Sequence, residues 1–187
     1  MNLIDRTATR IARTIRENYP EAASEKVLFY SASLLLSTMF AIIVTLSLCM
    51  ITNHLTQAVV STIIFLLIRY LSGGYHFNSS MICSLWTIFI LTGSAHVRFD
   101  YLYAGACFDV ISIIIFSLKA PKGLNNVSRI APKYYPILKY VCVLFISLNF
   151  FIQSSMLSTI FLIQALTLTE AAYFILSAIE RGWRYET

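Results

Sequence analysis

Six long apolar runs, separated by short polar segments, make up most of the chain. A helix needs about 20 apolar residues to cross a bilayer, and the first and last runs exceed this length. The runs cover approximately residues 27–50, 55–71, 80–97, 101–118, 134–151 and 156–179. The pattern predicts an all-α, polytopic membrane protein with about six transmembrane helices. Because the second and third runs are short, a four-span arrangement in which they form a re-entrant hairpin is the alternative.

The first 19 residues show a different pattern, with apolar residues at helical spacing and arginines on another face. The apolar positions are Leu3, Ile4, Ala8, Ile11, Ala12 and Ile15, and the arginines are Arg6, Arg10 and Arg13. This predicts an amphipathic helix over residues 1–19 that lies at the membrane surface. A soluble helix that leads into the first span is the alternative. We expect a single integral membrane domain over residues 1–187, with the transmembrane bundle over 27–180.

The composition places the chain among integral membrane proteins rather than soluble ones. Hydrophobic residues make up 58% of it and charged residues 12%, whereas soluble domains carry about 25% charged residues. The mean hydropathy of +0.73 agrees with this class. A net charge of +5 would suit a nucleic-acid partner, but the basic residues are scattered between apolar runs, as topology signals and contacts with anionic lipid are. We therefore expect membrane lipids, and no nucleic acid, as partners.

The distribution of lysine and arginine predicts which end of the bundle faces the cytoplasm. Six spans put both termini on one side of the membrane, and of the 14 Lys and Arg residues only Arg98 then falls on the other side. Positively charged residues are retained on the cytoplasmic side. The pattern predicts a multi-pass protein of the cell membrane with both termini, the polar segment at residues 69–83 and the loop 119–133 in the cytoplasm.

The polar segment between the second and third runs carries the residue types that chemistry requires. Gly73 and Gly74 let the backbone turn sharply and expose its N–H groups. Favourable N-cap residues follow, which predicts that a helix begins there. These residues are Asn78, Ser79 and Ser80.

Within this segment, Cys83 and His76 form a candidate catalytic pair at the cytoplasmic face. The expected helix start places Cys83 in the first turn, where the helix dipole stabilises a thiolate. The His76 imidazole titrates near neutral pH and can act as the base. In one continuous helix the two side chains would lie about 10 Å apart along the axis, so the break must fold His76 back over the helix start. The alternatives are a solvated interfacial histidine and a cysteine that packs.

Further polar residues are candidates for supporting roles. Four of them would bind substrate or an oxyanion: Arg69, Gly73, Gly74 and Ser80. For Arg69, a topological anchor at the interface is the alternative. Ionisable residues within membrane spans are functional candidates, so Asp109 and Glu170 are each a possible third catalytic member, with an interhelical polar contact as the alternative.

The remaining cysteines do not indicate a metal site or a disulfide framework. Cys49, Cys107 and Cys142 lie inside apolar runs and form no CxxC pair, so we expect them to pack. No metal and no cofactor is predicted.

At these residues the chain resembles the accessory gene regulator B (AgrB) family, the integral-membrane cysteine endopeptidases of Gram-positive quorum sensing. The resemblance rests on the arginine and the Gly-x-His-x6-Cys spacing between Arg69 and Cys83, on the amphipathic N-terminal segment, and on the basic, proline-containing loop before the last two runs. It implies that His76 and Cys83 are catalytic and that Arg69 is the arginine of the family motif.

The resemblance also implies a reaction. A short amphipathic propeptide (AgrD-like) would be cleaved at its C-terminal side through an acyl-enzyme thioester on Cys83. The acyl group would then pass to a cysteine or serine of the peptide, giving a cyclic thiolactone or lactone without ATP. Family members self-associate, so a homodimer is expected. The chain departs from the family in the loop 119–133, where its basic residues are sparser.

Two other functions fit the same residues. A membrane acyltransferase would use the same thiol. A small transporter or peptide exporter without hydrolytic activity would line its path with Asp109, Glu170 and Arg69 and would gate it with His76.

Overall fold

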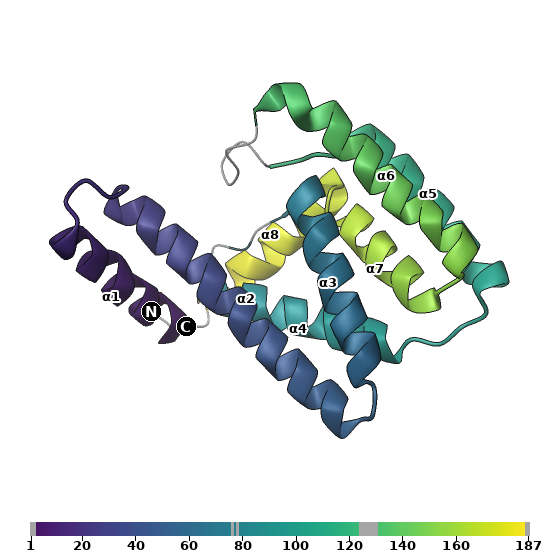
Figure 1. The fold of residues 1–187 in the computed structure, drawn as a ribbon, viewed down its shortest axis with the longest axis horizontal. Coiled ribbons are helices and arrows are strands. Elements are labelled where there is room, and N and C mark those ends of the chain that lie inside the picture. Colours follow the sequence, from purple (N-terminus) through teal and green to yellow (C-terminus); the bar gives the residue numbers. More distant parts are fainter. Residues whose placement is uncertain (1–2, 76, 78, 124–130, 186–187) are drawn as a thin grey trace.

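The computed structural model describes residues 3–75, 77, 79–123 and 131–185, and within them the chain is helical (Figure 1). The α-helices in chain order are α1 (Leu3–Asn18), α2 (Glu25–Ile51), α3 (Leu55–Ser72), α4 (Ser80–His96), α5 (Ala106–Lys119), α6 (Tyr135–Ile152), α7 (Ser155–Leu166) and α8 (Glu170–Tyr185). A π-helical turn, η1 (Tyr101–Gly105), precedes α5, and a 3-10 turn, η3 (Pro132–Tyr134), precedes α6.

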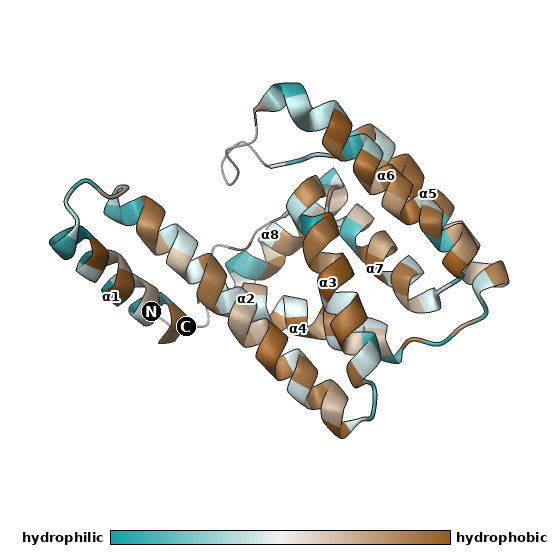
Figure 2. Ribbon diagram, in the orientation of Figure 1, coloured by the Kyte–Doolittle hydropathy of each residue, from teal (hydrophilic) through white to brown (hydrophobic). Residues whose placement is uncertain are grey.

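The helices have the length and apolar composition of a polytopic membrane protein. Four segments could each cross a bilayer: α2, α3, η1 with α5, and η3 with α6. The helix α4 is apolar but has only 17 residues. In Figure 2 the hydrophilic residues gather on α1 and at the beginnings of α2 and α6, and hydrophobic ones cover most of the other helices. The all-α class is confirmed, whereas the expected count of about six spans is not.

The last apolar run does not form the single straight helix that its hydropathy predicts. It divides into α7 and α8, whose axes differ by 81°. The Thr167 hydroxyl donates to the Gln164 carbonyl at 2.7 Å, and the Thr169 hydroxyl accepts from the Ala172 N–H at 3.2 Å, at the start of α8. Threonine hydroxyls that bond to nearby backbone groups compete with a continuous helical ladder, which accounts for a break at this point.

The predicted N-terminal amphipathic helix is present as α1, and it packs against α2 (Figure 1). Its buried residues are Ile4, Ala8 and Ala12. With 27 residues, α2 is about 40 Å long, which exceeds the hydrocarbon thickness of about 30 Å.

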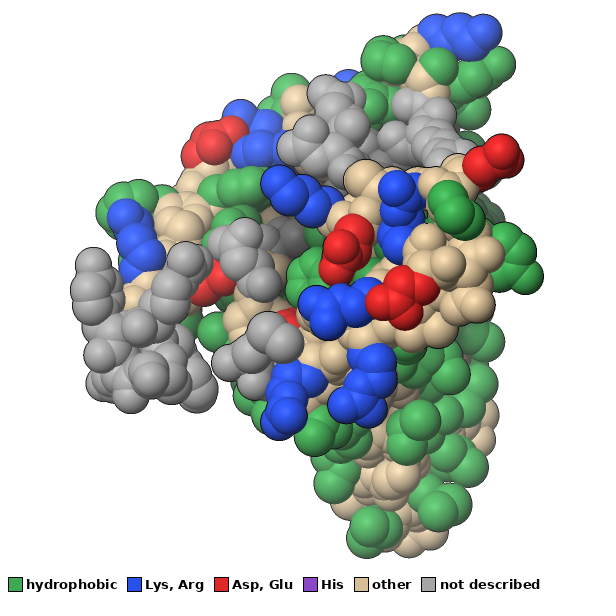
Figure 3. All heavy atoms as spheres, turned by 90° about the vertical axis from the view of Figure 1, so that its left-hand side faces the viewer, with side chains coloured by type: hydrophobic (Ala, Val, Ile, Leu, Met, Phe, Trp, Pro, Cys, Tyr) green, Lys and Arg blue, Asp and Glu red, His purple; other side chains and the backbone are tan. Residues whose placement is uncertain are grey.

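The two ends of the bundle differ in the segments that they bring together. At one end, Gly73 and Lys122 form an isolated parallel β-bridge, and the turn between α7 and α8 lies beside them. At the opposite end, the Thr52 hydroxyl is 2.8 Å from Nε2 of His96. Figure 3 shows charged side chains spread over the upper and middle parts of one face and a mostly apolar surface at its lower end.

The chain between the end of α3 at Ser72 and the start of α4 at Ser80, called the break below, is held in place by hydrogen bonds from two other segments. The Gly74 N–H donates to the Lys122 carbonyl and the Lys122 N–H donates to the Ser72 carbonyl, each at 2.9 Å. The buried Gln164 amide on α7 donates to the Ser72 hydroxyl at 3.0 Å and to the Gly73 carbonyl at 2.7 Å. The break is therefore a fixed element of the fold.

Substitution Gly74→Ala tests this arrangement. Gly74 has φ +121°, and a Cβ there would lie 2.6 Å from Arg69 Nη1 and 2.9 Å from Thr167 Oγ1. We expect Gly74→Ala to lower the free energy of unfolding by about 3 kcal/mol, measured by thermal unfolding in detergent micelles. Gly93→Ala on α4 is the matched control, because a Cβ there meets nothing within 4 Å. Equal midpoints for the two variants would contradict the predicted strain.

Candidate functional site

Cys83 lies where the sequence predicts it, in the first turn of α4. Its N–H donates to the Ser79 carbonyl at 3.0 Å. Ser79 is the N-cap residue, although its side chain makes no capping hydrogen bond. Because α3 ends at Ser72 and α4 begins at Ser80, the helix is broken as the proposed pairing with His76 requires. His76 and Asn78 lie outside the described residues, so the pairing itself stays a prediction.

The half-buried Cys83 thiol faces polar groups from three other helices and from the break. The Phe77 backbone N–H makes a hydrogen bond to it, and Arg69 on α3 interacts with it electrostatically. Burial of the sulfur is the largest effect and opposes a thiolate, whereas these two interactions favour one. Glu180 on α8 and Tyr30 on α2 also interact electrostatically with the thiol.

The Arg69 guanidinium packs against the backbone of the break. One guanidinium nitrogen, Nη2, donates to the Tyr75 carbonyl. The other, Nη1, occupies the space that a Cβ at Gly74 would need. Arg69 thus contacts the backbone on both sides of the Gly74–Tyr75 peptide and also faces Cys83. This position differs from that of an anchor that reaches into the lipid headgroups.

The helix α8 contributes two residues that the sequence interpretation did not select. The Tyr75 hydroxyl donates to Oε2 of Glu180 at 2.9 Å, and the Tyr75 ring packs edge-to-face on Tyr173 at 5.1 Å between centroids. Burial, and then the bond to Glu180, raises the pKa of Tyr75 to about 12. The phenol therefore stays protonated and keeps donating at neutral pH.

Glu180 is only 4% exposed despite its charge. The spacing of residues in the sequence could have indicated that Glu180 is buried. Tyr173, Leu176 and Glu180 share one helix face, so this carboxylate interrupts an otherwise apolar stripe. A straight final helix would have carried this residue away from the break, and the sequence interpretation assumed such a helix.

The other groups predicted to bind substrate lie at the site but bond to the protein itself. The Gly73 N–H donates to the Arg69 carbonyl at 3.0 Å, and the Gly74 N–H donates to Lys122. The Ser80 hydroxyl donates to the Asp5 carboxylate of α1 at 2.6 Å and lies 2.5 Å from the Ser33 hydroxyl of α2. These bonds join the start of α4 to α1 and α2.

The two carboxylates considered as third catalytic members lie elsewhere. Asp109 is fully buried at the opposite end of the bundle, where its Oδ2 accepts from the Tyr101 hydroxyl and from the Asn149 amide, each at 2.8 Å. Glu170 lies 2.5 Å from Nζ of Lys122, and its side chain is 75% exposed. Neither is among the groups that interact with Cys83 in the described part of the chain.

The other cysteines differ in burial. Cys49 and Cys142 belong to buried apolar clusters, whereas Cys107 is exposed. Over the described ranges, no group of three or more His, Cys, Asp or Glu side chains is arranged to hold a metal ion.

Comparison with known proteins identifies the family. The model of the family described as "Accessory gene regulator B" matches residues 8–179. The accessory gene regulator protein B of Staphylococcus aureus strain JH9 is 28% identical over 125 residues, which cover 62% of this chain and 66% of that protein. The protein of the same name from the bovine strain RF122 is 29% identical over 117 residues, covering 57% and 62%.

The aligned part of the chain spans just under two thirds of the length of these relatives. No solved structure matches the chain. Because the family model covers nearly the whole sequence, the chain belongs to the accessory gene regulator B family.

Proposed function

We propose that the protein is a membrane-embedded cysteine endopeptidase of the accessory gene regulator quorum-sensing system, which cleaves an AgrD-like propeptide and cyclises the product. The observation that carries the proposal is the environment of Cys83. Its thiol lies at a helix start, beside a break in the backbone, and faces both the Arg69 guanidinium and the Phe77 N–H. Burial of the sulfur opposes a resting thiolate, so a base must remove the thiol proton, and the Arg69 guanidinium and the Phe77 N–H are then placed to stabilise the thiolate that nucleophilic catalysis requires.

In the proposed reaction, the Cys83 sulfur attacks the carbonyl carbon of the scissile peptide bond, and His76 takes the thiol proton. The C–N bond then breaks, His76 returns the proton to the leaving amine, and the C-terminal tail departs. A cysteine thiol or serine hydroxyl of the bound peptide next attacks the thioester. The ring closes as a thiolactone or lactone, and Cys83 leaves as a thiol. The ring-closing step exchanges the thioester on Cys83 for a thiolactone or lactone, so closing the ring needs no ATP.

We place the site at the cytoplasmic face of the cell membrane. The break, Lys122 and the turn between α7 and α8 meet at one end of the bundle, and the basic residues of the sequence other than Arg98 are assigned to that side. A peptide made in the cytoplasm would reach Cys83 directly. Lipids surround the apolar helices, and the family resemblance implies a homodimer.

Asp109 supports an exporter as the second candidate function. This carboxylate is 0% exposed, and its Oδ1 has no hydrogen-bond partner in the described structure. Buried ionisable groups in membrane spans often mark transport paths.

The nucleophile can be tested with Cys83→Ala. We expect this variant, reconstituted in vesicles, to lose release of the C-terminal tail from an AgrD-like propeptide, because the site then lacks the thiol that would form the thioester. Mass spectrometry of the wild-type protein should detect an acyl adduct on Cys83. Cys107→Ala, at the exposed cysteine, should retain both signals. Persistent cleavage by Cys83→Ala would overturn the proposal.

Three carboxylate variants separate the positioning roles. Tyr75 precedes His76 in the chain, so the bond that fixes Tyr75 to Glu180 restricts the break beside Cys83. We expect Glu180→Gln to reduce kcat for tail release about tenfold or more, with little change in KM. Glu170→Gln should have little effect, because its ion pair is exposed.

Asp109→Asn should lower thermal stability while sparing kcat, whereas a loss of peptide export alone would favour the exporter.

A further inference from the structure

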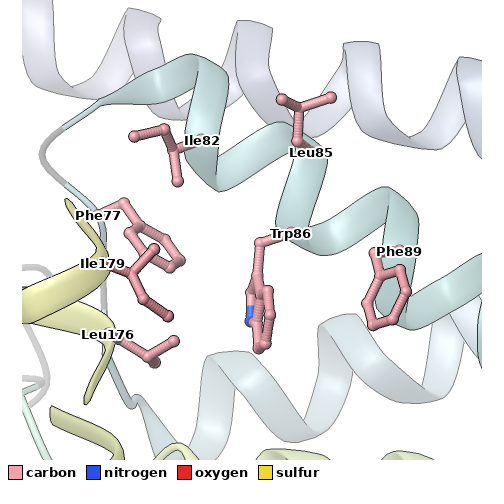
Figure 4. Close-up of a pocket in the computed structure, with 7 residues that line it drawn as sticks. All are labelled: Phe77, Ile82, Leu85, Trp86, Phe89, Leu176 and Ile179. Atoms are coloured by element: carbon pink, nitrogen blue, oxygen red, sulfur yellow. The ribbon is translucent and has the colours of Figure 1, made fainter. Parts of the chain in front are cut away.

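An apolar cavity of about 310 Å³ lies between α4 and α8. Figure 4 shows side chains from both helices directed into it, including Ile82 and Trp86 of α4 and Leu176 and Ile179 of α8, with Phe77 of the break at one side. The lining is apolar throughout. Cys83 of the proposed catalytic pair does not line this cavity, and neither do Lys122 and Gln164, which hold the break between α3 and α4.

Cys83 does not line the cavity itself but lies beside residues that do. Cys83 directly follows Ile82 and lies about 60° around the helix from Trp86, so its thiol is at the edge of the face that lines the cavity. Phe77 directs its ring into the cavity, while its N–H bonds to the Cys83 sulfur. On the facing helix, Glu180 interacts with Cys83 and follows Ile179.

We infer that this cavity binds the side chain of the substrate residue whose carbonyl carbon Cys83 attacks, and that it selects a bulky, uncharged apolar side chain. The inference rests on the proposed endopeptidase function. A charged side chain would lose its water without gaining a partner from this lining. The volume is at the lower limit for small-molecule sites, about 300 Å³, which suits one large side chain.

The reaction itself explains why the acyl side needs such a subsite. The C-terminal tail leaves after the first step, but the acyl group must stay on Cys83 until the peptide's own nucleophile attacks. A side chain buried between α4 and α8 would hold the thioester in place during this interval. A lipid acyl chain is the competing occupant, because Phe89 at the far side of the cavity is 70% exposed.

The test changes the shape of the cavity and measures substrate preference. Two synthetic versions of an AgrD-like propeptide carry Leu or Ala before the scissile bond. We expect the wild-type protein to prefer the Leu version at least about tenfold in kcat/KM for tail release. Leu176→Phe fills the cavity and should abolish or invert this preference. Ile175→Phe is the matched control, because Ile175 is 56% exposed and does not line the cavity.

The outcomes separate this inference from the proposed function. An unchanged Leu/Ala ratio in Leu176→Phe, with cleavage that still requires Cys83, would overturn the subsite but leave the endopeptidase. Cleavage by Cys83→Ala would overturn the endopeptidase. If Leu176→Phe does not fold, Ile179→Ala, which enlarges the cavity, should shift the preference from Leu toward Trp.

A lipid arm completes the test. In a Trp183→Phe background only Trp86 remains, and brominated phosphatidylcholine quenches its fluorescence if an acyl chain enters the cavity. The Leu propeptide should relieve that quenching in Cys83→Ala protein. Quenching that no propeptide relieves would assign the cavity to lipid.

Discussion

The break between α3 and α4 places polar backbone between two apolar helices, and the structure depends on how that backbone is satisfied. An unpaired peptide group in a nonpolar environment costs several kcal/mol. The Lys122 backbone makes hydrogen bonds with Ser72 and Gly74, and the Gln164 amide donates to the Gly73 carbonyl. The groups that satisfy this backbone therefore come from the segment after α5 and from the end of α7. The break cannot form this way until both are in place.

The bend between α7 and α8 follows from the same requirement. Gln164 and Thr167 lie next to Gly73 and Gly74 of the break. If α7 continued straight, Glu180 would lie about 20 Å further along its axis. The 81° turn instead brings α8 to the start of α4. It gives Tyr75 its hydrogen-bond acceptor and the apolar cavity its second wall. One change of direction thus supplies both the polar and the apolar side of the site.

The sequence predicted those parts of the site that depend on neighbouring residues. Glycines at 73 and 74 and the N-cap at Ser79 indicated a break and a helix start, and the structure has both, with Cys83 in the first turn. Partners distant in the chain, such as Glu180, could not be predicted this way. Hydropathy reports whether a residue prefers an apolar environment, but not the direction of the helix that carries it. Only Thr167 and Thr169 marked the bend, and such hydroxyls are common in membrane helices that stay straight.

Lys122 shows why a count of basic residues is an incomplete guide to the loop before α6. Its backbone holds the break, and its ammonium bonds to the Leu168 carbonyl at 3.3 Å, pairs with Glu170, and lies 4.1 Å from the centroid of the Tyr173 ring. The charge is thus engaged within the protein. A lysine that joins three segments would be needed for the fold whether or not its neighbours are basic. The sparse charge of this loop therefore need not weaken the site, because the lysine that orders the break is present.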